Sequence, residues 1–127
     1  MNQRQRLLVV DDSSSTTAIL ADYLDRIGYR ARFASGGPQA LAMIRDGLQT
    51  DAVVYDATMP ELGGPAFVRQ LRSDGHRTPV LLMTAGRGGA DADGADAAIA
   101  KPFSLVEFGD TLLRMLAAPR RPEAKGS

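Results

Sequence analysis

Two adjacent carboxylates follow a short apolar run near the start of the chain, in the sequence LLVVDD of residues 7–12. Charged Asp11 and Asp12 would repel each other by roughly 4 kcal/mol at a separation of about 4 Å and an effective dielectric constant near 20. A bound cation would offset this repulsion. The same acids could instead lie at the start of a helix formed by the following SSST, where the helix dipole favours negative charge. The stretch therefore allows two interpretations, a metal site or a helix start.

Three further polar residues follow short apolar runs later in the chain. Asp56 comes after AVVY, Thr84 after VLLM and Lys101 after AAIA. Each alone would be an ordinary loop residue, but with Asp11 and Asp12 they form a set of three carboxylates, a hydroxyl and an ammonium group. Such an oxygen-rich set suits hydrated Mg²⁺ better than zinc or copper. The set predicts a magnesium site if the fold brings these residues together.

The apolar runs alternate with segments of helical period, which predicts a parallel sheet with helices on both faces. Leu7–Val10, Ala52–Tyr55 and Val80–Met83 show no polar alternation, as is typical of strands covered on both sides. Residues 29–34 (YRARFA) do alternate, which predicts an edge strand with one wetter face. Ligands bind such sheets at the carboxyl ends of the strands. This fold would gather the polar residues at one edge.

Four helices are expected between and after the strands. A cap at Ser13–Ser15 and a stop at Gly28 bound the first, Pro38 and Pro65 open the second and third, and the pair Ser104 and Glu107 forms a capping-box pattern before the last. Their apolar residues at helical spacing are Leu20, Tyr23, Leu24 and Ile27, then Leu41, Ile44 and Leu48, then Phe67, Val68 and Leu71, then Leu105, Phe108, Leu112 and Met115.

The crossover between the last two strands is unusual. Residues 85–95 (AGRGGADADGA) are close to the minimum of about 10–12 residues for such a connection. Four glycines and no large apolar side chain lie between Gly86 and Gly94. Because each interior glycine costs about 1 kcal/mol in a helix, we expect the helix at this place, the fourth along such a fold, to be short or missing, with a glycine-rich loop instead.

The length fits a single domain, and the composition indicates no nucleic-acid, membrane or thiolate site. The 127 residues include fifteen basic and fifteen acidic side chains and no cysteine, so we expect no direct binding to nucleic acid or membrane and no thiolate site. No long apolar run or secretion signal is visible, which predicts a cytoplasmic protein. Residues 119–127 (PRRPEAKGS) are expected to be a disordered tail or linker after a domain of residues 1–118.

The ordered motifs VVDD (9–12), YDATMPELGG (55–64), MTA (83–85) and AKPF (100–103) together resemble the response-regulator receiver domain of bacterial two-component signalling, the CheY-like superfamily. The resemblance extends from Arg6 to about Ala118. It implies a flavodoxin-like, doubly wound sheet of five parallel strands in the order 2-1-3-4-5.

The resemblance also implies a role for each matching residue. Asp56 would be the phosphoacceptor, Asp12 a direct ligand of Mg²⁺ or Mn²⁺, and Asp11 a ligand through water, while the backbone carbonyl of Thr58 would complete the metal contacts. Thr84 and Lys101 would bind the phosphoryl group. The phosphoryl donor would be a histidine kinase or a histidine phosphotransfer protein.

Two positions depart from the family pattern. Ala98 stands where family members usually carry an aromatic residue that rotates with the threonine, so a readout through that ring is lost. Gly63 replaces a common aspartate. With the glycine-rich crossover, these differences predict an atypical output face.

A phosphoacceptor signalling domain, which catalyses only its own phosphorylation and dephosphorylation, is the leading hypothesis. A magnesium-dependent phosphohydrolase with an aspartyl nucleophile is the alternative, but haloacid-dehalogenase-like enzymes place a second acid where this chain has Thr58. A phosphorylation-independent interaction module is a third possibility. A flavodoxin-like cofactor protein is disfavoured because the acids after the first strand would repel a flavin phosphate.

Overall fold

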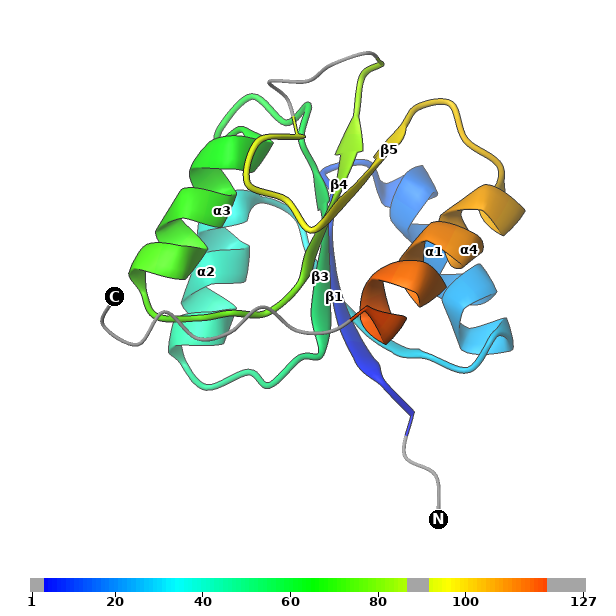
Figure 1. Ribbon diagram of the computed structural model, residues 1–127, viewed down its shortest axis with the longest axis horizontal. Coiled ribbons are helices and arrows are strands. Elements are labelled where there is room, and N and C mark those ends of the chain that lie inside the picture. Colours follow the sequence, from blue (N-terminus) through cyan, green and yellow to red (C-terminus); the bar gives the residue numbers. More distant parts are fainter. Residues whose placement is uncertain (1–3, 87–91, 119–127) are drawn as a thin grey trace.

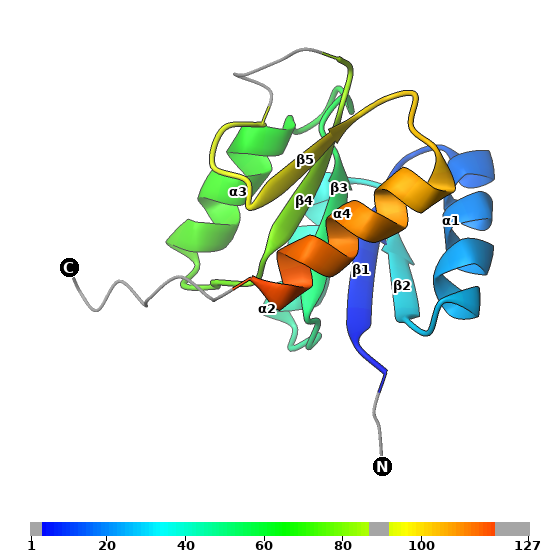
Figure 2. The same cartoon turned by 45° about the vertical axis from the view of Figure 1, so that its right-hand side comes forward.

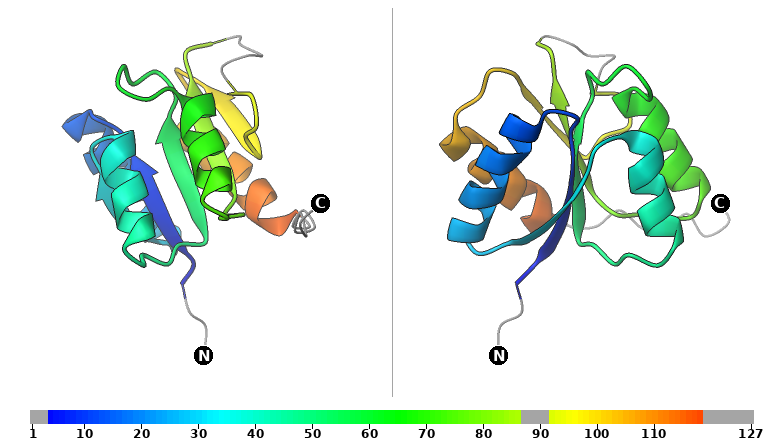
Figure 3. Two further views of the ribbon diagram at one scale, coloured as in Figure 1. Left: turned by 90° about the vertical axis from the view of Figure 1, so that its left-hand side faces the viewer. Right: turned by 180° about the vertical axis from the view of Figure 1, so that it is seen from behind.

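One parallel sheet forms the centre of the computed structural model, which describes residues 4–86 and 92–118. Its order is β2-β1-β3-β4-β5, as predicted. Helices α1 and α4 lie side by side on one face, and α2 and α3 cover the other (Figures 1 and 3). The elements are β1 (Arg6–Val10), α1 (Ser14–Arg26), β2 (Arg30–Ala34), α2 (Gly37–Arg45), β3 (Ala52–Asp56), α3 (Gly64–Ser73), β4 (Val80–Thr84), β5 (Ala97–Ala100) and α4 (Leu105–Ala117).

The central strands are apolar on both sides because each side faces a helical layer. Leu8 and Val10 of β1 belong to the core beneath α2 and α3, whereas Leu7 and Val9 belong to the core beneath α1 and α4. Every residue of β3 and β4 is buried, while β2, at one edge, alternates between exposed and partly buried residues before Ala34. The predicted strand types are thereby confirmed.

Local signals fix the helix ends. Ser13 caps α1 by accepting a hydrogen bond from the Thr16 N–H, and Ser104 and Glu107 form the expected capping box at α4. Pro38 and Pro65 lie in the first turns of α2 and α3, where a missing N–H costs little.

Two helical residues were predicted wrongly. Leu48 lies beyond α2, which ends at Arg45, because Gly47 adopts a φ of +104° that ends the helix. Ile27 is the C-cap of α1 and is 43% exposed, so the buried face of that helix rests on Leu20 and Leu24. Both errors concern the last turn, where spacing alone does not show where a helix stops.

The crossover from β4 to β5 contains no α-helix among its described residues, 85–86 and 92–96. The rest of the predicted glycine-rich loop, residues 87–91, lies outside the described residues, as does the predicted tail at 119–127. Figure 2 shows α4 running along the sheet next to α1 after this crossover. Over the described ranges, no helix combines the length and apolar character that crossing a bilayer requires.

Candidate functional site

Adjacent strands bring the three predicted carboxylates together. Val10 is the register partner of Tyr55, so Asp11, just after β1, lies next to Asp56 at the end of β3. Carboxylate oxygens of Asp11, Asp12 and Asp56 lie within 4.8 Å of one another. Asp11 and Asp56 are buried and Asp12 is exposed. The cluster therefore has the composition and spacing for one divalent cation held by oxygen ligands.

Asp11 carries an oxygen that the protein does not satisfy. Its Oδ1 accepts a hydrogen bond from the Ser13 N–H at 2.9 Å, but its buried Oδ2 has no hydrogen-bond partner within the described part of the chain. Lys101 Nζ is 4.0 Å from this oxygen. Burial, aided by the charges of Asp56 and Asp12, raises the pKa of Asp11, against the Ser13 hydrogen bond and the Lys101 charge. A cation at this oxygen would remove the deficit, so these residues fit a metal.

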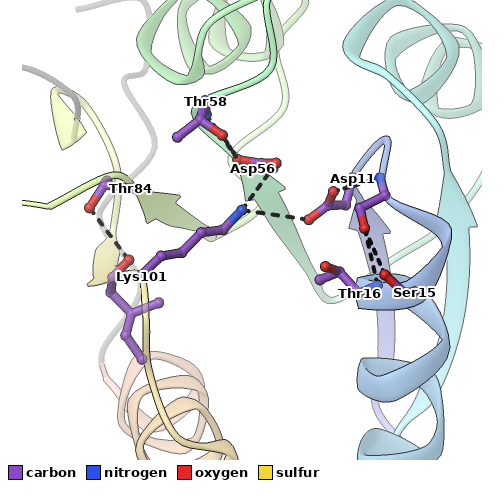
Figure 4. A network of polar contacts seen from close by, with 9 residues as sticks. Asp11, Ser15, Thr16, Asp56, Thr58, Thr84 and Lys101 are labelled. Carbon is purple, nitrogen blue, oxygen red and sulfur yellow. Dashed lines mark hydrogen bonds and ion pairs between the residues drawn. The ribbon is translucent and has the colours of Figure 1, made fainter.

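Asp56 is held in its charged form. Its Oδ1 accepts hydrogen bonds from the Thr58 N–H at 2.9 Å and the Thr58 hydroxyl at 2.6 Å, and its Oδ2 lies 3.3 Å from Lys101 Nζ (Figure 4). Burial alone would raise the pKa of Asp56, but the Thr58 hydrogen bonds and the Lys101 charge together outweigh it and lower the pKa. Asp56 is thus ionised at neutral pH, and among the described residues its Oδ2 accepts no hydrogen bond from a hydroxyl or an amide.

Thr84 and Lys101 reach the site from β4 and the end of β5. The Lys101 N–H donates to the Thr84 carbonyl at 2.8 Å, which continues the strand pairing to the edge. The buried Thr84 hydroxyl lies 3.5 Å from the Ile99 carbonyl, a long and weak hydrogen bond. The Lys101 side chain extends across the site toward both Asp11 and Asp56 (Figure 4). Asp11, Asp12, Asp56 and the Lys101 ammonium therefore converge, whereas the Thr84 hydroxyl contacts the Ile99 carbonyl instead.

The loop after β3 is anchored by a residue that the sequence analysis treated only as an apolar strand residue. The Tyr55 hydroxyl donates to the Leu62 carbonyl at 2.6 Å, and its ring stacks on Phe67 with centroids 4.1 Å apart. Burial, and then the charges of Asp56 and Glu61, raise the pKa of Tyr55. A tyrosine inside an otherwise aliphatic strand was the available signal, because a buried hydroxyl requires a partner.

The Thr58 hydroxyl is the second contact that the sequence analysis missed. Only the Thr58 carbonyl was predicted to act, as a metal ligand, and that role stays a prediction. The hydroxyl bond to Asp56 has a sequence signal, since an aspartate with a threonine two residues later favours a local turn of this kind.

The two departures from the family pattern have different surroundings. Ala98 is exposed on β5 and offers no ring beside Thr84. Gly63 is the N-cap of α3 and makes no side-chain cap hydrogen bond, and a Cβ at this position would meet no atom within 4 Å among the described residues. The backbone at position 63 therefore has room for a Cβ, and position 98 presents only an exposed methyl group.

Comparisons with known proteins show which family and fold this chain shares. A family model described as the response regulator receiver domain matches residues 7–112. The response regulator MprA of Mycobacterium sp. strain KMS and that of Mycobacterium bovis strain BCG are each 42% identical to the chain over 122 residues. Each alignment covers 91% of the chain and 51% of the relative, so the chain spans about half the length of the curated relatives it matches.

Solved structures share the fold. The chemotaxis response regulator CheY4 of Vibrio cholerae superposes with a TM-score of 0.80 at 29% identity, over 89% of this chain and 99% of that one. The receiver domain of the sensor histidine kinase PA1611 from Pseudomonas aeruginosa superposes with a TM-score of 0.79 at 27% identity, over 91% and 100%. The PA1611 domain was solved with a magnesium ion coordinated in its active site cleft.

Proposed function

Because the chain belongs to the response regulator receiver domain family of two-component signalling, we propose that it accepts a phosphoryl group on Asp56 and that this covalent mark is its signal. The observation that carries the proposal is the position of Asp56 Oδ2, 3.3 Å from Lys101 Nζ in a cluster of three carboxylates. An ionised oxygen beside a fixed cation is the arrangement that transfer to a carboxylate requires.

The transfer exchanges one bond to phosphorus for another. Asp56 Oδ2 forms a bond to phosphorus while the bond from phosphorus to the donor's imidazole nitrogen breaks, and the electron pair leaves with the imidazole. The lowered pKa of Asp56 keeps the attacking oxygen ionised without a general base. The ammonium of Lys101 offsets the charge of the incoming phosphoryl oxygens, which is the main electrostatic obstacle for an anionic nucleophile.

Mg²⁺ or Mn²⁺ would be held by the carboxylates of Asp11, Asp12 and Asp56 and the backbone carbonyl of Thr58. When bound, the ion supplies positive charge that neutralises the phosphoryl oxygens in the transition state. The unsatisfied Oδ2 of Asp11 supports this assignment, because the metal-free protein offers that buried oxygen no hydrogen bond within the described residues.

Thr84 and Lys101 would bind the phosphoryl group after transfer. The weak 3.5 Å contact between the Thr84 hydroxyl and the Ile99 carbonyl costs little to break, so the hydroxyl is available to donate to a phosphoryl oxygen. Movement of these two residues would couple the mark to β4 and β5. Since Ala98 supplies no ring, the coupling would pass through backbone and loop positions, which makes the output face atypical.

The donor would be a histidine kinase or a histidine phosphotransfer protein in the cytoplasm. The domain itself would catalyse only its own phosphorylation and dephosphorylation and contact neither nucleic acid nor membrane directly. The longer MprA relatives suggest that an output domain acts with it, because the present chain matches about half of their length.

Intact-mass analysis tests the proposal. After incubation with acetyl phosphate and Mg²⁺, the wild-type chain is expected to gain one phosphoryl group, and Asp56→Asn none. Asp46→Asn, a change of the same kind at an exposed position outside the site, should behave as wild type. Phosphoryl gain in Asp56→Asn to the wild-type level would overturn the assignment. Sustained multiple turnover of unrelated phosphoesters would favour the hydrolase. If the wild-type chain gained no phosphoryl group, the interaction module would be favoured.

A further inference from the structure

The sheet ends at β2 with one edge open for pairing. Within the described residues β2 pairs only with β1, and it lies at the outer side of the sheet (Figure 2). The Arg30 N–H donates to the Gln5 carbonyl, and the Asp11 N–H donates to the Ala34 carbonyl. Because backbone groups of a strand point alternately to opposite neighbours, the N–H and C=O groups of Ala31 and Phe33 face away from β1. These groups are available to a further strand.

Positive charge gathers along this edge on one face. Arg32 is the register partner of Leu8, which faces α2 and α3, so Arg30 and Arg32 project on that face. With Arg6 they line a partly open hollow of about 250 Å³, which residues 48–50 of the loop before β3 also line. Arg6 lies 3.6 Å from Asp51, but no residue in the described part of the chain forms an ion pair or side-chain hydrogen bond with Arg30 or Arg32.

The opposite face of the same edge carries apolar side chains next to a charged pair. Ala31 and Phe33 alternate with the two arginines and project toward α1. There they line a second hollow with Tyr29 and Ala21, next to Arg30 and the ion pair of Arg4 and Asp25. Ala31 and Phe33 are both partly exposed. The edge therefore presents Arg30 and Arg32 on one face, Ala31 and Phe33 beside the Arg4–Asp25 ion pair on the other, and free backbone groups between them.

We propose that this β2 edge is a docking site for an extended segment of a partner protein, which adds as a sixth strand and carries acidic residues alternating with apolar ones. Residues two apart in a strand lie about 6.6 Å apart on the same face, so alternate acids of the segment match Arg30 and Arg32. Main-chain hydrogen bonds to Ala31 and Phe33 supply affinity, and the two arginines supply specificity.

Charge excludes the other obvious occupants. A second copy of the chain pairing edge to edge would place Arg30 and Arg32 against the same arginines. The chain's own residues 119–127 contain three basic side chains and one acidic side chain, so they are repelled as well. The proposed segment is the one whose charge opposes this edge.

The test uses a capped, fluorescently labelled peptide, Glu-Val-Glu-Val-Glu, whose binding is followed by anisotropy. We expect saturable binding that weakens with added salt, and slower hydrogen exchange at the amides of Ala31 and Phe33. Lys-Val-Lys-Val-Lys and the non-alternating Glu-Glu-Glu-Val-Val should bind at least about tenfold more weakly. No binding at millimolar peptide, equal binding of the non-alternating peptide, or unchanged exchange at these amides would each overturn the proposal.

A charge-matched pair of variants locates the site. Arg30→Glu with Arg32→Glu should weaken peptide binding by about tenfold or more. Arg69→Glu with Arg114→Glu changes net charge equally at exposed positions of α3 and α4 and should leave affinity within about twofold. An equal loss in both variants would indicate general charge attraction and refute the edge site. Phosphoryl uptake from acetyl phosphate should be normal in both, which shows that they fold and separates this test from that of Asp56.

Discussion

Two buried aspartates at the site differ in pKa direction although they are neighbours. Burial raises the pKa of both, yet the two Thr58 hydrogen bonds and Lys101 reverse the outcome for Asp56, whereas Asp11 has one backbone donor and an unsatisfied oxygen. The side chains therefore divide the work. The pKa of Asp56 favours its anion in the protein alone, as the proposed phosphoacceptor role requires, whereas the pKa of Asp11 disfavours its anion unless a cation is bound.

Asp11→Asn should stabilise the metal-free protein. The charge of Asp11 is disfavoured in the folded state, so removing it should raise the free energy of unfolding by about 1 kcal/mol. Because the folded-state pKa of Asp11 is raised, the destabilisation by its charge should disappear from the wild type as the pH falls through that pKa, where the acid becomes protonated and neutral. Urea unfolding in EDTA measures the gain. Added Mg²⁺ should stabilise wild type but not the variant, and a less stable variant in EDTA would contradict the argument.

Thr58→Val tests the hydroxyl bond to Asp56 while keeping the side-chain shape. Losing a hydrogen bond to a charged group should raise the pKa of Asp56 toward its ordinary value. The hydroxyl also orients the Asp56 carboxylate, and if its loss raises the activation free energy by about 1.4 kcal/mol, the phosphorylation rate should fall roughly tenfold. Carbon-13 NMR titration of the metal-free protein and the rate with acetyl phosphate measure these effects, and Thr50→Val, remote from the site, is the control. An unchanged pKa and rate would show that the backbone donor suffices.

At the scale of elements, α4 approaches α1 closely because Gly109 has no side chain. A Cβ at Gly109 would lie 2.6 Å from the Tyr23 hydroxyl and 3.3 Å from its ring, closer than packed atoms tolerate. Helix propensity acts in the opposite direction, since alanine is preferred over glycine inside a helix by about 1 kcal/mol. At position 109 the close contact with Tyr23 therefore favours glycine, although helix propensity favours alanine.

The effect of Gly109→Ala on the free energy of unfolding should therefore depend on whether residue 23 is tyrosine or phenylalanine. In wild type we expect destabilisation by about 1–2 kcal/mol, because the methyl group displaces Tyr23. In a Tyr23→Phe background, which lacks the hydroxyl, the same substitution should be neutral or stabilising by up to about 1 kcal/mol. Chemical denaturation of the four proteins gives the coupling energy. Additive effects across the cycle would refute the steric explanation.

The sequence predicted the strands and their ends better than the side-chain contacts and helix ends. Uninterrupted apolar runs and the alternating YRARFA segment were enough for a parallel sheet with an edge strand, whereas the strand order came from the resemblance to receiver domains. Strand ends were enough to group Asp11, Asp12 and Asp56 with Lys101. Side-chain bonds were not predictable to the same degree. The Tyr55 contact with Leu62 depends on where the loop after β3 returns, and the end of α2 before Leu48 depends on the conformation of Gly47. Spacing along the chain specifies neither.

At the scale of the whole molecule, charges of opposite sign occupy opposite ends of β1. The acidic cluster follows Val10 at one end, and Arg6 begins the strand at the other beside Arg30. A five-residue strand separates them by roughly 16 Å, which exceeds the Debye length of about 8 Å at physiological salt. The two ends are therefore electrostatically independent despite sharing one strand.

This separation predicts independent binding. Mg²⁺ affinity should be the same with and without saturating Glu-Val-Glu-Val-Glu, within about 0.5 kcal/mol, because the two ligands share no contact residue. Calorimetric titration of Mg²⁺ in both conditions checks the prediction. A larger coupling would mean that β1 or β2 moves when either ligand binds, since distant charges alone could not produce it.

The two bonds from Thr58 to one oxygen of Asp56 have a stereochemical result. They fix the plane of the carboxyl group, so its two oxygens cannot exchange places by rotation while both bonds hold. The proposed nucleophile, Oδ2, is then a single oxygen whose lone pairs lie in one fixed plane, rather than one of two equivalent atoms that exchange by rotation. Under the proposed function, a phosphohistidine would present its phosphorus to this oxygen in that plane, so Thr58 would constrain the approach of the phosphoryl donor.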